Sequence, residues 1–135
     1  MKEQLISFET AKLAKEKGFN EGCLYDYNNS SDLRKNVHSL FYNDSLDFYI
    51  APTQSLLQKW LREVYNIEVD VMRYTYSGGE YQGKCYMWAI DKYDPNYNPE
   101  TEDPWILETR KSQGYDFKVY EEALEEGLYQ ALLLI

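Results

Sequence analysis

Two segments in the first half of the chain repeat apolar residues at three- and four-residue steps, the pattern of helices that pack one face on a core. Ser7 can cap the first helix, and Gly18 follows its expected end. The second helix begins after Pro52, with Thr53 as the capping residue and Asn66 at the end. The pattern therefore predicts one helix within each of these bounds.

The most regular apolar stripe lies further along the chain, from about Tyr120 to Leu134, and predicts a third helix. The stripe consists of Tyr120, Ala123, Leu124, Gly127, Leu128, Ala131 and Leu132. Because Gly127 has no side chain, we expect the helix to approach its sheet closely at this position. Four glutamates are expected to face outward: Glu121, Glu122, Glu125 and Glu126.

Shorter runs of β-prone residues, some of them alternating apolar and polar, predict strands between the helices. The expected strands are 23–27, 37–42, 46–50, 67–76, 81–93 and 105–110. Turn residues at 43–45 and 77–80 predict two hairpins. The elements predict a single α+β domain over residues 1–135, with a mostly antiparallel sheet of about four to five strands and two or three helices packed on it. Strand order and oligomeric state are left open.

Composition adds a strong acidic bias to this picture. The chain has 135 residues, 44% of them hydrophobic, and a net charge of −9, which disfavours direct binding to nucleic acids. Residues 98–135 hold 9 acidic and 3 basic residues, a net charge of −6, whereas residues 1–97 hold 14 and 11, a net charge of −3. Whether the acidic residues of 94–126 form one patch is left open.

The first residues and the cysteines bear on location. The N-terminal segment lacks the long apolar stretch of a signal peptide, and no apolar run is long enough to span a bilayer. The chain has two cysteines, Cys23 and Cys85. We therefore expect a cytoplasmic protein without membrane contact, in which both thiols pack as small hydrophobic groups.

One segment nearly matches a phosphate-binding loop. Gly78, Gly83 and Lys84 have the required spacing, but Cys85 stands where Ser or Thr would hold magnesium. Such a loop must also open a helix, and the residues that follow are β-prone. A hairpin turn is the favoured interpretation.

A second segment resembles a calcium-binding loop in the same incomplete way. Asp94, Asn96 and Asn98 occupy the first ligand spacings of an EF-hand, but Pro99 replaces the required Gly and Trp105 the bidentate Glu. An EF-hand is rejected. A solvated, proline-rich loop is favoured over a looser divalent site, so no metal and no cofactor are expected.

Residues for catalysis are few. His38 is the only histidine, and no local pattern links it to Cys23 as a nucleophile and base. Carboxylates are too numerous among 23 acidic residues to single out a pair. The sequence therefore favours a protein that is not an enzyme, and no catalytic residue is assigned.

Tyrosine is unusually frequent, with 14 copies, and four tyrosines cluster around one predicted hairpin. These are Tyr74, Tyr76, Tyr81 and Tyr86. They form the candidate binding face, because aromatic rings can stack on a ligand. Cross-strand aromatic packing within the sheet explains the same cluster and is favoured over stacking on a ligand.

Residues 51–63, APTQSLLQKWLRE, resemble a segment of uncharacterised small proteins of bacteriophages and prophage-like mobile elements of bacteria. In those proteins a proline-initiated helix is followed by a hairpin and a closing helix, and residues 120–128, YEEALEEGL, are similar to their C-terminal signature. Val119 departs from the pattern, since a capping residue is expected there. The resemblance implies an accessory protein that acts by binding a partner inside a bacterial cell, and it assigns no functional residue.

Three functional hypotheses follow. The first is a small non-enzymatic accessory protein that binds a protein partner, because aromatic and acidic residues dominate and a catalytic constellation is missing. The second is an acidic mimic of nucleic acid that acts on a DNA-binding protein, based on the charge of residues 98–135. The third is a small enzyme with an unrecognised site.

Overall fold

The computed structural model describes residues 3–76, 83–103, 105–110 and 117–135, and for residues 74–76, 83–84 and 105–110 it describes the backbone only. The helices are α1 (Phe8–Glu16), α2 (Gln54–Tyr65) and α3 (Tyr120–Leu133). The strands are β1 (Tyr25–Asn28), β2 (Leu33–Lys35), β3 (Phe48–Ile50), β4 (Ile67–Tyr76), β5 (Gly83–Tyr93) and β6 (Trp105–Arg110). They form two antiparallel sheets, in the orders β2-β1-β3 and β4-β5-β6.

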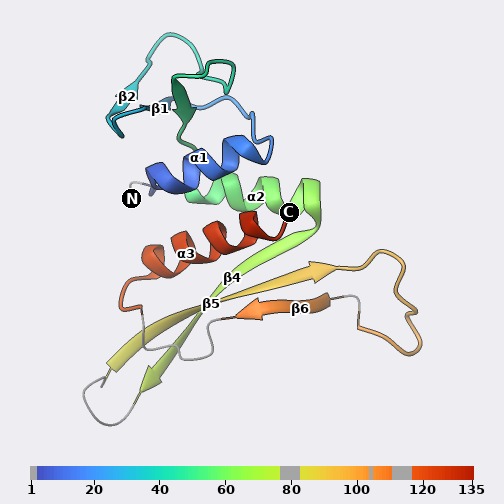
Figure 1. Cartoon of the computed structure of the whole chain (residues 1–135). Coiled ribbons are helices and arrows are strands. Elements are labelled where there is room, and N and C mark those ends of the chain that lie inside the picture. The colour runs from blue at the N-terminus through green and yellow to red at the C-terminus, as the bar shows by residue number, and fades with distance from the viewer. Residues whose placement is uncertain (1–2, 77–82, 104, 111–116) are drawn as a thin grey trace.

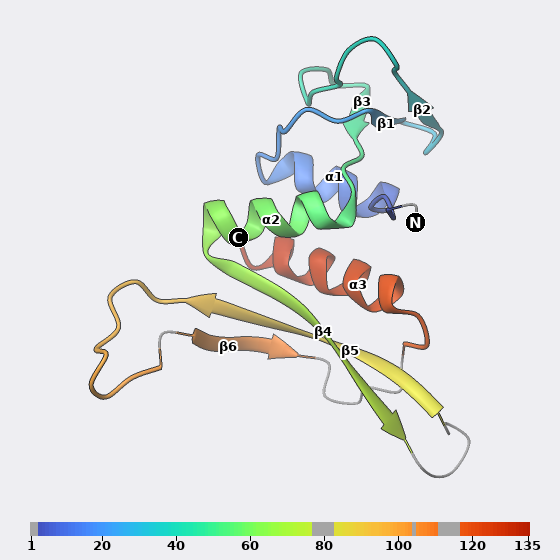
Figure 2. The ribbon, with the colours of Figure 1, turned by 180° about the vertical axis from the view of Figure 1, so that it is seen from behind.

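The helices lie between the two sheets (Figure 1). All three lie on one side of the sheet β4-β5-β6, with α3 against it and α1 next to the small sheet β2-β1-β3 (Figures 1 and 2). Contacts of α3 with β4 and β5, and of α1 with β3 and α3, connect these layers. The described part of the chain thus forms a stack of small sheet, helices and large sheet.

The helix ends follow from local chemistry. Ser7 accepts a hydrogen bond from the amide of Thr10 at the start of α1, and Thr53 accepts one from Leu56 at the start of α2. Gly18 and Asn66 follow these helices with φ of 93° and 56°, left-handed values that favour Gly and Asn. Val119 precedes α3 without a side-chain cap, in keeping with its apolar side chain. Both caps and all three helices were predicted correctly.

The β4–β5 pairing of the large sheet is regular, whereas the β5–β6 pairing shifts register between Ile90 and Asp91. Strands β4 and β5 pair without interruption from Ile67 opposite Lys92 to Tyr76 opposite Gly83. A Cβ atom on Gly127 of α3 would lie 2.8 Å from Val69 Cγ1 and 3.0 Å from Trp88 Cβ. The predicted close approach of this helix to the sheet is therefore confirmed.

The small sheet differs from the prediction. The expected strand 23–27 begins two residues later and extends to Asn28, and the hairpin of 37–42 with 46–50 does not form. Instead β3 and the unpredicted strand β2 each pair with β1, and of residues 37–42 only Phe41 makes a bridge, to Cys23. The hairpin prediction was wrong because Val37 and Leu40 remain 71% and 47% exposed and bury no strand face.

One hydrophobic cluster joins all the layers. Ile6 and Phe19 from the N-terminal region, Leu57 and Leu61 from α2, and Leu128 from α3 are at most 1% exposed and belong to it. The α+β class and the antiparallel pairing are thus confirmed, although the strands divide into two sheets of three. No described helix combines the length and apolar character needed to cross a membrane.

Candidate functional site

The four candidate tyrosines do not form one described surface. Tyr81 lies outside the described residues, and only the backbone is described for Tyr74 and Tyr76. The sheet register places Tyr74 opposite Cys85 and Tyr86 opposite Arg73, so Tyr74 and Tyr86 are not direct cross-strand neighbours.

The described ring of Tyr86 packs edge-on against Tyr120 at the start of α3, with ring centroids 5.9 Å apart. This contact packs the helix on the sheet. It is not a cross-strand contact, so the cross-strand packing expected of these tyrosines stays a prediction. A stacking platform for a ligand stays a prediction.

The two near-motifs have structural roles. Residues 83–93 form β5, so no helix opens after Lys84 to hold a phosphate, and Gly78 lies outside the described residues. In the loop after β5, the side chain of Asp94 accepts a hydrogen bond from the Asn96 amide and that of Asn98 from the Glu100 amide. In the described part of the chain, no three His, Cys, Asp or Glu side chains group so as to hold a metal ion.

The thiol of Cys23 is poorly suited to attack a substrate. It is buried and lies 3.2 Å from the backbone oxygen of Glu21, to which it donates a hydrogen bond. Burial, and secondarily the charge of Glu21, raise the pKa of Cys23 to about 12, so the thiol stays protonated at neutral pH. His38 is exposed after β2. The Cys23–His38 pair therefore lacks the activated thiolate that nucleophilic catalysis needs.

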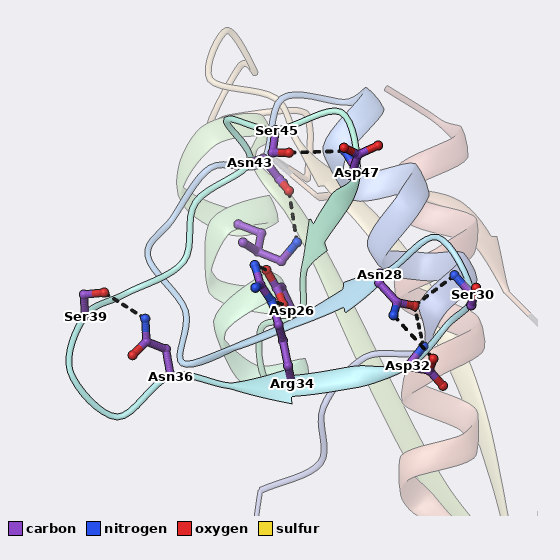
Figure 3. Close-up of polar contacts among 11 residues, drawn as sticks. Asp26, Asn28, Ser30, Asp32, Arg34, Asn36, Ser39, Asn43, Ser45 and Asp47 are labelled. Carbon is purple, nitrogen blue, oxygen red and sulfur yellow. Dashed lines mark hydrogen bonds and ion pairs between the residues drawn. The ribbon is translucent and has the colours of Figure 1, made fainter.

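The small sheet contains a dense set of polar contacts (Figure 3). Asp26 is 1% exposed and receives two hydrogen bonds from Arg34, at 2.6 and 3.0 Å. The guanidinium of Arg34 also lies over the rings of Phe41 and Phe48, 4.6 and 3.8 Å from their centroids. Because these groups satisfy one another, the cluster holds the sheet and offers no vacant polar group to a ligand.

Side chains in the neighbouring loops bond to backbone groups as well. Asn28 accepts hydrogen bonds from the amides of Ser30 and Asp32, and Asn43 accepts one from Ile50 (Figure 3). These bonds replace regular backbone pairing where the strands are short. The polar character of this region is structural.

A cavity of about 820 Å³ has a different character. It lies between the N-terminal segment, the start of α2 and the start of α3. Its described lining consists of Glu3, Gln4, Leu5, Ile6, Ser7, Tyr27, Leu33, Gln54, Phe117, Val119, Glu121, Glu122, Glu125 and Glu126. Five of these residues are glutamates, and none of the described lining residues is basic. We call this space the acidic cavity.

Glu125 has a structural role at the inner wall of the acidic cavity. One carboxylate oxygen accepts hydrogen bonds from the Ser7 amide at 3.1 Å and from the Thr10 hydroxyl at 2.5 Å. The other accepts one from the side-chain amide of Gln54 at 3.1 Å. Glu125 therefore ties α3 to the starts of α1 and α2, and the prediction that it faces outward was wrong.

The other glutamates of the acidic cavity are more accessible. Glu121 and Glu122 are exposed, Glu126 is half-buried beside Gln130, and Glu3 accepts a hydrogen bond from Ser55 at 2.7 Å. Within the described part of the chain, none of these four makes an ion pair. Their charges remain available to a cation.

A smaller cavity of about 250 Å³ adjoins the acidic cavity. The two share Glu3, Gln4, Gln54 and Glu121, and the smaller one extends along α2 to Gln58 and along α3 to Tyr120 and Leu124. The side chain of Gln58 donates a hydrogen bond of 2.6 Å to the backbone oxygen of Val69 in β4. The space next to the acidic cavity thus continues towards β4, lined there by uncharged residues.

Seven of the nine acidic residues after position 97 lie in two separate places; Glu108 is in β6, and Asp116 is outside the described residues. The glutamates of α3 start at one end of the stack, whereas Glu100, Glu102 and Asp103 lie in the loop at the opposite end of the large sheet (Figures 1 and 2). The charge of residues 98–135 predicted an excess of acidic residues in this part of the chain. It did not predict their separation into two places, because distance along the sequence does not give distance in space. It also missed Glu3, which joins the α3 glutamates from the other end of the chain.

The chain was compared with models of protein families, with curated proteins and with solved structures, and no significant match was found.

Proposed function

We propose that this protein is a non-enzymatic binding protein whose acidic cavity receives a basic segment of a protein partner. The observation that carries the proposal is the lining of this cavity by five glutamates and by no described basic side chain. Apolar residues such as Leu5, Phe117 and Val119 lie among these carboxylates. A Lys or Arg side chain offers a cationic head and an apolar stem that complement such a lining.

The test measures binding of a fluorescent lysine- and arginine-rich peptide, using fluorescence anisotropy at several salt concentrations. We expect binding that weakens steeply with added salt, because the contacts are between accessible charges. In the triple variant Glu121→Gln, Glu122→Gln and Glu126→Gln, affinity should fall roughly threefold to a hundredfold, at about 0.2–1 kcal/mol for each lost ion pair.

A matched control distinguishes binding in the acidic cavity from general attraction to the negative net charge of the protein. The triple variant Glu9→Gln, Glu16→Gln and Glu63→Gln removes three charges from α1 and α2, and none of these residues lines the cavity. It should bind the peptide nearly as well as the unchanged protein. Equal loss of affinity in both triple variants would show general attraction to an acidic protein and would refute the proposal.

The nucleic-acid mimic is the alternative, and it needs the loop of 94–103 and the start of α3 to act as one surface. Neutralising Glu100, Glu102 and Asp103 tests it, since a mimic should then lose affinity for a DNA-binding protein as strongly as after the α3 changes. The expected phage or prophage setting and cytoplasmic location stay predictions.

A further inference from the structure

The outer edge of β4 is a row of backbone groups without partners in the described structure. Strand β4 is the first strand of the large sheet and pairs only with β5. In an antiparallel pair, successive residues direct their N–H and C=O groups alternately towards the partner strand and away from it. The residues that point away can therefore be identified from the contacts around the sheet.

Three contacts give the same assignment. The oxygen of Asn66 accepts a hydrogen bond from the Tyr93 amide, so even-numbered residues point towards β5. The oxygen of Val69 is bonded to Gln58 of α2, outside the sheet. Tyr86, opposite Arg73, directs its amide away from β4, to Phe117. The backbones of Val71, Arg73 and Thr75 therefore face outward, and we call these three the outer edge of β4.

In the described structure this edge lacks two of the usual protections of an exposed strand, a bulge and a proline, although charged side chains such as Arg73 lie along it. The β4–β5 register runs through ten consecutive pairs without a bulge, and β4 contains no proline. Among the described contacts, helix α2 reaches this side of β4 at the oxygen of Val69, through Gln58. A regular, uncovered edge of this kind can pair with an extended chain, which adds a strand to the sheet.

Charge on the adjoining sheet face indicates which chain fits. Glu68 lies directly opposite Asp91, and Asp70 follows two residues along β4, so three carboxylates share one face. Like charges opposite each other destabilise a sheet. The pKa of Asp70 is raised by its partial burial and by the charges of Glu68 and Asp91, against the opposing effect of Arg62. Arg62 already forms an ion pair with Glu68 at 3.0 Å, so a cationic side chain placed beside Asp70 would relieve the repulsion that remains.

We propose that an extended, basic segment of a protein partner pairs with the outer edge of β4 as a fourth strand of the large sheet. Among its alternate side chains, a lysine or arginine lies beside Asp70 of β4, with Glu68 next along that face of the strand and Asp91 one strand further in. Past Val71 the segment meets Gln58, which also lines the smaller cavity next to the acidic cavity. The inference rests on the proposed function for the identity of the partner, and adds that the segment binds as a strand.

The first test uses a synthetic peptide in which lysine and valine alternate, and a second peptide of identical sequence with every backbone amide methylated, because alternate methylation would leave one edge of the peptide able to pair. Both carry the same charge, but only the first can donate a full row of hydrogen bonds to β4. We expect methylation to weaken binding at least tenfold in calorimetric titration. Equal affinity of the two peptides would overturn strand pairing and leave binding in the acidic cavity intact.

The second test changes the protein. Arg73→Pro removes a single N–H group, which points away from β5, so the β4–β5 pairing is kept and proline is tolerated at such an edge position. Arg73→Ala is the matched control, because it loses the same charge and keeps the N–H. We expect Arg73→Pro to bind the alternating peptide at least fivefold more weakly than Arg73→Ala, while both bind polylysine in the acidic cavity equally. Equal peptide binding by the two variants would contradict strand pairing.

Two further results separate the outcomes. If polylysine binds and the alternating peptide does not, strand pairing is refuted and the proposed function stands, whereas failure of both ligands to bind refutes both proposals.

Amide hydrogen exchange provides a readout that does not depend on the variants, since the amides of Val71, Arg73 and Thr75 should be protected when the peptide is bound. A dimer in analytical ultracentrifugation, paired through the same amides, would show that a second copy takes the edge and would overturn the proposal.

Discussion

The two sheets have the same number of strands and are stabilised in opposite ways. In the sheet β4-β5-β6, long regular strands bury apolar side chains such as Val69 and Ile90 beneath the helices. In the sheet β2-β1-β3, strands of three or four residues surround the ion pair of Asp26 and Arg34. The first depends on buried area and shape, the second on a few polar contacts, so different substitutions should damage them.

The largest expected effect is the loss of Arg34 from the small sheet. Arg34→Ala leaves the carboxylate of Asp26, 1% exposed, without its partner, and should lower the free energy of unfolding by about 3–5 kcal/mol. Asp26→Ala should cost less, because the Arg34 side chain is 50% exposed and water can solvate it. Urea denaturation measures both, with Lys35→Ala as a control expected within about 0.5 kcal/mol of the unchanged protein. A larger loss of stability in Asp26→Ala than in Arg34→Ala would contradict the dependence of this sheet on a buried, paired carboxylate.

Removing the contact that joins the two regions should have the next largest effect. Glu125→Ala deprives Ser7, Thr10 and Gln54 of a charged acceptor and should cost about 2–4 kcal/mol. Glu122→Ala, one turn away and exposed, is the control and should change stability by less than about 0.5 kcal/mol. Thermal unfolding followed by circular dichroism distinguishes them, and similar melting temperatures for the two variants would rule out this role of Glu125.

Two glycines allow the same atom to be added in each region. A Cβ at Gly127 meets the tightly packed Val69 and Trp88, whereas one at Gly22 meets the far ends of Leu40 and Tyr42, which are 47% and 46% exposed and can move. Overpacking lowers the free energy of unfolding by about 1–3 kcal/mol, and the higher helix propensity of alanine raises it by about 1 kcal/mol. Gly127→Ala should therefore lower the free energy of unfolding by roughly 1 kcal/mol. Gly22→Ala should stay within about 0.5 kcal/mol in the same denaturation assay. A larger loss at Gly22 would mean that the small sheet is as rigidly packed as the large one.

The smallest expected effect is a pH dependence from the small-sheet side. Since the pKa of Cys23 is about 12 in the folded protein and about 8.5 in an unfolded chain, the unfolded state releases its proton first as the pH rises. The stability contribution of the protonated thiol is complete below about pH 8.5 and declines above it, by about 0.8 kcal/mol at pH 9. Stability curves of the unchanged protein and of Cys23→Ala should therefore converge between pH 7 and pH 9. Parallel curves would show that the thiol titrates normally in the fold.

The same difference explains what could be predicted from the sequence. The helices and the strands β4, β5 and β6 have local signals, such as the capping side chain of Thr53 and the alternation of Ile67, Val69 and Val71. Strand β2 has no such signal, because its three residues are all exposed and it is held through the pairing of Arg34 with Asp26. Partners of this kind become visible only when the chain has folded.

The site shows the same limit. The acidic character of α3 was evident from its glutamates, but the cavity needs residues as distant as Glu3 and Glu126 to meet. Glu125 was assigned to the outward face because helical periodicity does not show which neighbouring helix begins beside it. The tyrosine cluster was a local signal, and the described ring of Tyr86 is used in packing α3 on the sheet.

The meeting of the first and last helices also sets how this protein reaches its fold. Ser7 bonds to Glu125, 118 residues further along the chain, and Lys17 bonds to the backbone oxygen of Ile135. Closing loops of this length costs chain entropy before the contacts compensate for it, so proteins rich in such contacts fold in milliseconds to seconds. We therefore expect α1 and α3 to dock late and together. Until they do, the apolar stripe of α3 is exposed to other chains, and this is the stage at which aggregation should compete with folding.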